Sequence, residues 1–326
     1  MKVGIAFVSD YSDPSLLPEY ARDVEERGYH SLWVPEHFMY GDVFTMLGAA
    51  AASTKRIYLG TGIACIPVRH PALTAMAAST LHKISGGRAI LGIGLGDESM
   101  MRNSLGIDIS NPLEVLYEAT EIVKTVFKGC GDYTGKRYRF MGLSCPPLEN
   151  PPKVLIAAVG FKALQLAGRL GDGVVLTAFT ATKYVEAAVK TVREACAEAG
   201  RDPSRLEYAA MIATAAAGQR RELKKLAAIY LSFPRRAETV LAREQLESLD
   251  MNELRRLVRL GAYGEALRML NDEIVEDLSA TGDANSVRDK LEKLKAIGIT
   301  LPILYPVGNP QSFLNPDFVK KVTDRC

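Results

Sequence analysis

Cysteine and histidine are scarce in this chain and are nowhere clustered. Five cysteines and four histidines are spread over 326 residues, without a CxxC pair and without the HxH or HExxH spacing of metal ligands. Zinc sites and disulfide frameworks require such clusters. The sequence therefore indicates neither a disulfide-stapled fold nor metal catalysis.

Long apolar runs and an excess of one charge are missing as well. No hydrophobic stretch approaches the roughly 20 residues of a membrane-spanning helix, and the N-terminal MKVGIAFVSD is typical of a strand rather than a signal peptide. The formal net charge is +2, with lysine and arginine scattered along the chain. We expect a cytoplasmic protein that binds neither nucleic acid nor a membrane.

Short apolar runs alternate with amphipathic helical patterns along most of the chain. Hydrophobic residues make up 48% of it, which is enough for a large core. Strands are predicted at residues 3–8, 31–34, 56–63, 89–93, 154–158, 173–176, 206–212 and 299–306. Each is followed by a helical pattern, which makes an α/β fold of the (β/α)8 TIM-barrel type more economical than two Rossmann-like halves.

Residues 219–278 interrupt this alternation. They are helical in pattern and strongly charged, with no convincing strand, and are too many for an ordinary connecting loop. We predict one domain over residues 1–326 that carries this block as a helical insertion between the seventh and eighth strands. The insertion is a candidate lid, and extra helical bulk used for dimer packing explains it equally well.

Three alternating glycines, Gly92, Gly94 and Gly96, lie in the segment GRAILGIGLGDES. A dinucleotide-binding turn needs G-x-G-x-x-G on the first strand–helix unit and an acid at the end of the next strand. Here the spacing is G-x-G-x-G, the unit is the fourth, and the glycines lie partly inside the strand. The pattern favours tight barrel packing, or backbone lying close to a flat ligand.

The carboxyl ends of the strands build the active site of a TIM barrel. The residues at these ends are Ala6, Val8, Glu36, His37, Gly62, Ile63, Ala64, Cys65, Gly96, Asp97, Val159, Gly160, Thr177, Met211 and Tyr305. Small and apolar residues dominate, with one histidine and one or two carboxylates. Such a mouth suits a planar aromatic cofactor beside an acid/base pair, and does not suit a sugar hydrolase with two facing carboxylates.

His37 and Asp97 are the candidate catalytic residues of this set. The place of His37 directly after a strand favours a functional role over simple packing, whereas Asp97 is equally well explained as the cap of the next turn. Glu36 is better explained as a structural residue. Cys65 has no base placed beside it by spacing, so it is expected to be a small buried side chain.

Four segments together resemble the bacterial-luciferase-like superfamily, and most closely its coenzyme F420-dependent branch and the methylenetetrahydromethanopterin reductases within it. These segments are LWVPEHF, GTGIACIPVRHPA, SGGRAILGIGLGDES and GFKALQLAGRLGDGVV. The resemblance runs over nearly the whole chain and is weakest in the insertion.

The resemblance implies a hydride-transferring oxidoreductase that holds F420, a deazaflavin, at the barrel mouth. It places His37 beside the ring and Asp97 after the strand-four glycines as catalytic residues, and a non-proline cis peptide at Gly62–Ile63 against the back of the ring. The cofactor-binding residues that it implies are Gly62, Ile63, Ala64, Gly96, Gly160, Phe161, Lys162 and Thr177. Gly160, Phe161 and Lys162 would help to hold the phosphate.

One departure concerns the substrate. The methanopterin reductases carry a glutamate in the first strand where this chain has Ala6, so an F420-dependent relative acting on another small organic molecule is favoured over the reductase itself. An FMN-dependent monooxygenase and a non-catalytic flavin-binding relative are the alternatives. By analogy, a homodimer or higher homo-oligomer is expected.

Overall fold

The computed structural model describes residues 2–8, 12–216, 218–233 and 236–323. Within this part of the chain, eight parallel strands form a closed barrel. They are β1 (Gly4–Ala6), β2 (Ser31–Val34), β3 (Tyr58–Thr61), β5 (Ala89–Gly94), β8 (Lys153–Ala157), β9 (Gly173–Leu176), β10 (Glu207–Ala216) and β12 (Leu301–Pro306). All eight predicted strands are confirmed, with small shifts at their ends.

The barrel is closed by pairing of its last strand with its first. Neighbouring strands pair in the order β1, β2, β3, β5, β8, β9, β10, β12, and β12 returns to β1, where Gly4 lies opposite Ile303. Two short strands extend the sheet: β4 (Ala64–Cys65) continues beside β5, and β11 (Ala280–Gly282) pairs with the end of β10. The predicted (β/α)8 barrel is therefore confirmed.

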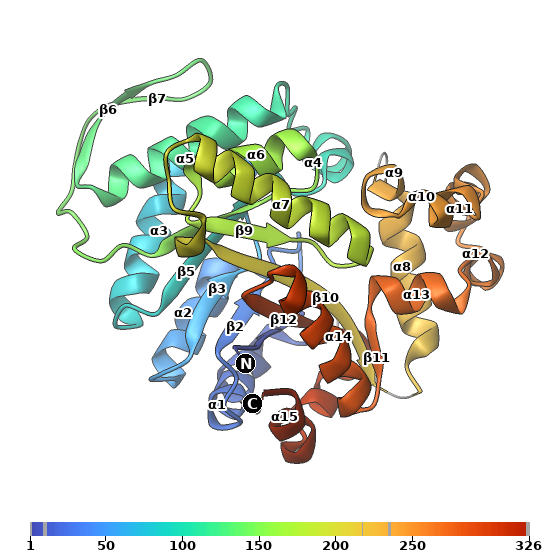
Figure 1. Cartoon of the computed structure of the whole chain (residues 1–326). Coiled ribbons are helices and arrows are strands. Elements are labelled where there is room, and N and C mark those ends of the chain that lie inside the picture. The colour runs from blue at the N-terminus through green and yellow to red at the C-terminus, as the bar shows by residue number, and fades with distance from the viewer. Residues whose placement is uncertain (1, 9–11, 217, 234–235, 324–326) are drawn as a thin grey trace.

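Helices cover the outside of the barrel (Figure 1). They are α1 (Leu17–Glu26), α2 (Val43–Ser53), α3 (Pro71–Ile84), α4 (Glu98–Leu105), α5 (Pro112–Phe127), α6 (Phe161–Leu170), α7 (Thr182–Glu198), α14 (Ala284–Ile297) and α15 (Pro316–Thr323), with 3-10 turns at Pro14–Leu16, Ile66–Val68, Pro203–Arg205 and Pro310–Leu314. Among the described residues, none of the helices is long and apolar enough to cross a membrane.

A large aromatic ring, the indole of Trp33, lies in the barrel interior against two glycines. Trp33 is fully buried, and its Nε1 donates to Ser31 Oγ at 2.8 Å. A Cβ on Gly60 would collide with the indole ring, and one on Gly4 would lie 3.1 Å from its Nε1. Small residues opposite a large one are the usual way of filling a barrel of this size.

The connection between α5 and β8 is an ordered element of its own. It is an antiparallel hairpin of β6 (Cys130–Thr134) and β7 (Arg139–Ser144), which extends from the body in Figure 1. The buried carboxylate of Glu118 on α5 accepts the backbone N–H groups of Lys136 and Tyr138 at 2.7 and 3.0 Å. This contact with α5 fixes the turn of the hairpin.

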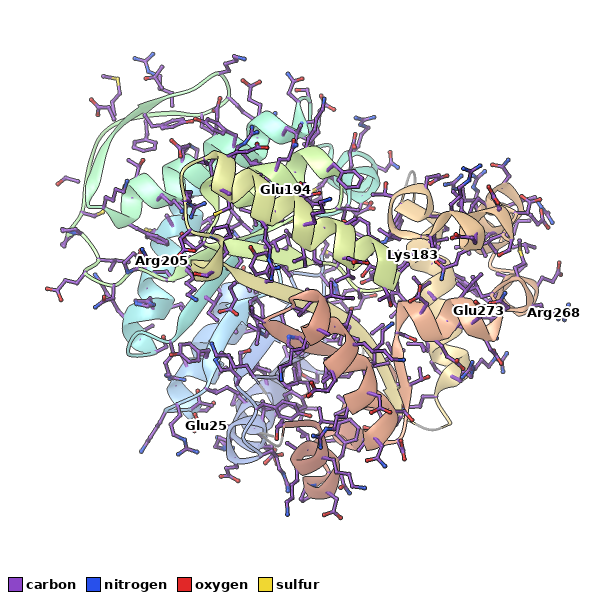
Figure 2. All side chains as sticks on the ribbon, viewed as in Figure 1. Glu25, Lys183, Glu194, Arg205, Arg268 and Glu273 are labelled. Atoms are coloured by element: carbon purple, nitrogen blue, oxygen red, sulfur yellow. The ribbon has the colours of Figure 1, made fainter. Side chains whose placement is uncertain are left out.

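The insertion is helical, as predicted, and lies to one side of the barrel (Figure 1). Its helices are α8 (Arg220–Ser232), α9 (Arg236–Val240), α10 (Arg243–Glu247), α11 (Met251–Arg259), α12 (Tyr263–Met269) and α13 (Asp272–Leu278). Long charged side chains point outward from its surface, as Figure 2 shows for Arg268.

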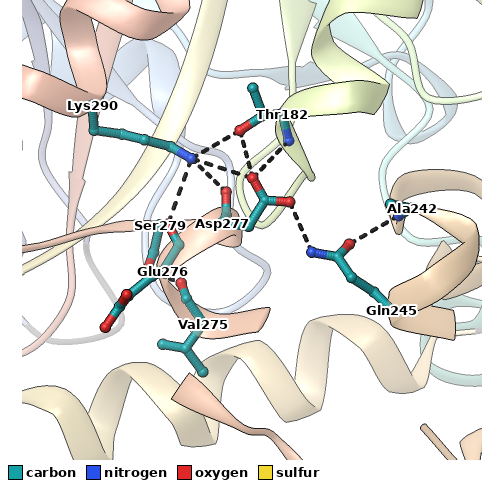
Figure 3. Close-up of polar contacts among 8 residues, drawn as sticks. All are labelled: Thr182, Ala242, Gln245, Val275, Glu276, Asp277, Ser279 and Lys290. Carbon is teal, nitrogen blue, oxygen red and sulfur yellow. Dashed lines mark hydrogen bonds and ion pairs between the residues drawn. The ribbon is translucent and has the colours of Figure 1, made fainter. Parts of the chain in front are cut away.

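A partly buried polar network attaches the insertion to the barrel (Figure 3). The carboxylate of Asp277 accepts the backbone N–H of Thr182 at 3.1 Å and the side-chain amide of Gln245 at 2.8 Å. Lys290 of α14 donates to the backbone oxygen of Asp277 at 2.6 Å. Burial raises the pKa of Asp277, but the Thr182 and Gln245 hydrogen bonds and the charge of Lys290 more than offset it, so the pKa lies below its usual value. The insertion is thus fixed to the start of α7 and to α14.

We expect Gly92→Ala to destabilise the protein by about 1–3 kcal/mol, because the new Cβ would collide with the backbone oxygen of Thr61 on the neighbouring strand. Gly48→Ala is the matched control: it lies within α2 with no atom within 4 Å of the added Cβ, and alanine there should stabilise by about 0.5–1 kcal/mol. Urea unfolding followed by circular dichroism measures both. Equal effects of the two substitutions would contradict this account of the glycine run.

Candidate active site

A bulge at the carboxyl end of β3 forms the floor of the barrel mouth. The peptide between Gly62 and Ile63 is cis, as the sequence resemblance implied. Val34 accepts the N–H of Gly62 at 2.8 Å, and Ile63 accepts the N–H of Glu36 at 3.3 Å. Ile63 is partly exposed, so it presents an apolar surface to the mouth.

The alternating glycines of β5 make space for this bulge. A Cβ on Gly94 would lie 3.1 Å from the side chains of both Ile63 and Ala157. Gly96 follows the strand with a φ of 71° and fits closely against Cys65. The glycine run is therefore explained by close approach of the β3–β4 bulge, which agrees with tight packing, one of the two interpretations that the sequence left open.

Glu36 fixes the bulge to the segment before α3. Its carboxylate, only 6% exposed, accepts the N–H of Cys65 at 2.7 Å and lies 2.7 Å from Arg69 Nη2. Arg69 also pairs with Asp42 at 2.8 Å, and its guanidinium lies over the ring of Phe44 at 5.3 Å. Glu36 is thus a structural residue, as expected.

His37 lines a cavity of about 620 Å³ between the β2–α2 loop and the end of α4. The lining residues are Glu36, His37, Phe38, Met39, Gly41, Asp42, Val68, Arg69, Leu105 and Ile107. His37 is half-buried. Of the predicted site residues in the described chain, His37 alone belongs to this lining, so the cavity lies beside the glycine and bulge floor rather than over it.

Asp97 caps α4, since its Oδ1 accepts the N–H of Met100 at 2.7 Å. It also acts electrostatically on Cys65. Burial, the charge of Glu36 and the charge of Asp97 raise the pKa of the Cys65 thiol to about 12, although Arg69 opposes them. Cys65 therefore remains a protonated, buried thiol, as the sequence indicated.

The other predicted cofactor residues lie at the ends of β8 and β9. Gly160 is the N-cap residue of α6, and Phe161 and Lys162 are exposed in its first turn. The hydroxyl of Tyr184 donates to the backbone oxygen of Val159 at 2.6 Å and holds this turn against α7. Thr177 directly follows β9 and is half-buried. Free amide groups at a helix start, next to a lysine, suit an anion.

Arg236 is a charged residue of the mouth that the sequence did not single out. It comes from α9 of the insertion, and its Nη2 donates to Thr177 Oγ1 at 2.9 Å and to the backbone oxygen of Ala178 at 2.7 Å. Burial lowers its pKa. No motif marks Arg236, because its partners lie almost sixty positions earlier in the chain.

The first strand contributes a small apolar residue to the mouth instead of a carboxylate. Ala6 is fully buried at the end of β1, so the structure places a methyl group where a carboxylate was the expected family feature. Met211 of β10 reaches across the barrel to Gly62. Among the described residues, no three side chains of histidine, cysteine, aspartate or glutamate cluster as metal ligands.

Comparison with known proteins extends over the whole chain. A family model described as luciferase-like monooxygenase matches residues 2–301. The 5,10-methylenetetrahydromethanopterin reductase of Archaeoglobus fulgidus is 31% identical over 99% of this chain and 96% of its own length.

Two solved structures have the same fold. The coenzyme F420-dependent tetrahydromethanopterin reductase of Methanopyrus kandleri superposes with a TM-score of 0.79 at 25% identity, over 98% of this chain and 96% of the other. An F420-dependent secondary alcohol dehydrogenase in complex with an F420–acetone adduct gives a TM-score of 0.79 at 20% identity, over 99% of both chains. On the family model and the full-length similarity, the chain belongs to the luciferase-like monooxygenase family.

Proposed function

We propose that the protein is an F420-dependent oxidoreductase that transfers a hydride between the deazaflavin and a small organic substrate. The observation that carries this proposal is the apolar floor at the barrel mouth, where Ile63 lies over Gly94 with Ala157 beside it. A flat, apolar floor with few polar groups at its rim suits a planar tricyclic ring. The full-length similarity to a methylenetetrahydromethanopterin reductase supports the same function.

The residues present fit this cofactor. Gly62, Ile63 and Ala64 would lie under the ring, with Gly96 and Thr177 at its edges. Gly160, Phe161 and Lys162 would hold the phosphate, because α6 begins there without a side-chain cap on its amide groups. When bound, F420 supplies or accepts a hydride at its C5 carbon.

The chain's own contribution is to orient the ligands, exclude water and handle a proton. His37 stands half-buried on the wall of a cavity large enough for a small substrate. We assign it the role of holding or moving the substrate proton. Asp97, held by the amide of Met100, is proposed as its acidic counterpart, and the insertion limits the access of water from the side of α9.

The substrate class follows from the relatives and from Ala6. Methylenetetrahydromethanopterin is the first candidate, because the Archaeoglobus protein is named for its reduction. The absence of a carboxylate at Ala6 favours a related molecule that does not need this group. FMN-dependent monooxygenation is the second candidate function, supported by the name of the matching family model.

Binding of the two cofactors separates these functions. We expect F420 to bind at least about tenfold more tightly than FMN when each is titrated into the purified protein and followed by absorbance and fluorescence. A preference for FMN, together with oxygen consumption by the reduced complex, would transfer the assignment to the monooxygenases. If the protein binds neither cofactor, both proposed functions are refuted and only the fold assignment stands.

His37→Ala should lower turnover by about 10²–10⁴-fold, which is the usual contribution of a positioned acid or base. The dissociation constant of F420 should stay within about threefold, since the floor under the ring is untouched. His82→Ala, in the last turn of α3, is the control and should change neither quantity. Unchanged turnover of the His37 variant would remove the residue from the mechanism.

We further propose that the cytoplasmic enzyme forms a homo-oligomer through α3. Leu73, Met76 and Ile84 are each more than half exposed and lie along one face of this helix. Met76→Glu should shift the protein to monomer in equilibrium sedimentation, whereas Met141→Glu, equally exposed on the hairpin, should not. A monomeric wild-type protein would contradict the proposal.

A further inference from the structure

We propose that Arg236 and Thr177 form a binding subsite for an oxyanion, a carboxylate or phosphate group carried by a ligand in the barrel mouth. Thr177 directly follows β9, at the end of the barrel where ligands bind. Arg236 is delivered to this place by the insertion, which the sequence had suggested only as a lid or as packing bulk.

The guanidinium of Arg236 is held firmly but is not neutralised. One nitrogen, Nη2, makes both of its hydrogen bonds, to Thr177 Oγ1 and Ala178 O. The ring of Tyr230 lies 4.8 Å from Cζ and fixes the plane of the group. Nε is buried without a hydrogen-bond partner. Within the described chain, no carboxylate lies within ion-pair distance of it, and Asp97 acts on it only through its more distant charge.

Two other arginines show the two ways in which a guanidinium is balanced in this molecule, by hydrogen bonds on every nitrogen or by counter-ions. Arg88 uses all three nitrogens on oxygens of Ser85, Ile57 and Thr54 at 2.6–3.0 Å. Arg69 pairs with two carboxylates. Arg236 has neither arrangement, although its Nε is buried.

A buried cation without a counter-ion is costly. A planar fork with a free donor is suited to a carboxylate or phosphate, because the charge-assisted bonds then offset the loss of hydration. The missing negative charge at Arg236 is thus most economically supplied by a ligand.

Attachment of the insertion does not by itself account for Arg236. The N–H of Ala181 already donates to the oxygen of Val240 at 3.0 Å, and Asp277 binds the start of α7. These contacts fix α9 and α13 without the guanidinium of Arg236. An apolar side chain would fill the place of Arg236 with less loss of hydration, if packing were its whole role.

Two sources can supply the oxyanion: an acidic group of the F420 tail, beside the phosphate proposed to lie at the start of α6, or an acidic group of the substrate. The cofactor source rests on the proposed function, whereas binding of inorganic phosphate does not. The test uses both probes on the full-length protein, so that failure of one is distinguished from failure of the other.

We would compare the wild-type protein with Arg236→Gln, and use Arg243→Gln, an exposed arginine of the same insertion, as the matched control. Inorganic phosphate should raise the melting temperature of the wild type and of the Arg243 variant, and should raise that of the Arg236 variant severalfold less, since the phosphate site proposed at the start of α6 remains. The dissociation constant of F420, and of the deazaflavin riboside that lacks phosphate, is measured by fluorescence on all three proteins.

Loss of about 10- to 100-fold in F420 affinity in the Arg236 variant, with riboside affinity unchanged, assigns the oxyanion to the cofactor. Unchanged F420 affinity with loss of the phosphate effect assigns it to the substrate. A wild type that binds phosphate but not F420 refutes the proposed function and leaves the subsite standing. If neither the phosphate effect nor F420 affinity depends on Arg236, the subsite is refuted.

Arg236→Lys and Thr177→Val serve if the glutamine variant does not fold. Lysine keeps the charge without the fork, and valine removes the hydroxyl that orients Nη2. Both should weaken the phosphate effect severalfold. An undiminished effect in both variants would likewise refute the subsite.

Discussion

The carboxylate of Glu36 is the contact on which the geometry of the mouth depends. Its two oxygens bind the amide of Cys65 in the bulge and the guanidinium of Arg69 before α3. Because the side chain is almost fully buried, these bonds are shielded from water and are correspondingly strong. The position of His37, the next residue along the chain, follows from them. Loss of Glu36 would also leave Arg69 with a single carboxylate partner, the exposed Asp42.

The bulge, in turn, explains why the neighbouring strand is built from glycine. Ile63 occupies the space that a side chain at Gly94 would take, and the backbone oxygen of Thr61 lies where a side chain at Gly92 would be. The apolar floor and the glycine run therefore depend on each other, because the bulge fits only where the neighbouring strand has no side chains. Deeper in the barrel, a large side chain is again accommodated by glycines, since Trp33 lies against Gly4 and Gly60.

The strands and most helices were predictable because each is a local pattern of apolar residues. The hairpin was not predicted, because its turn is fixed by Glu118 of α5, and the sequence pattern of the hairpin segment does not reveal that contact. At the site, the roles of Glu36 and Cys65 followed from the residues around them, whereas the cis peptide followed from the family resemblance alone. Arg236 escaped prediction because contact with Thr177 arises from tertiary packing between distant segments.

Closure of the barrel has a consequence for how the protein is made. β1 needs β12 as its second neighbour, and Tyr29 donates to the backbone oxygen of Phe313 at 2.7 Å. On the ribosome, the first strand therefore waits for the translation of almost three hundred further residues. Until then the nascent sheet has an open edge, the kind of surface that recruits chaperones or aggregates. Such long-range contacts make closure a late and slow step of folding.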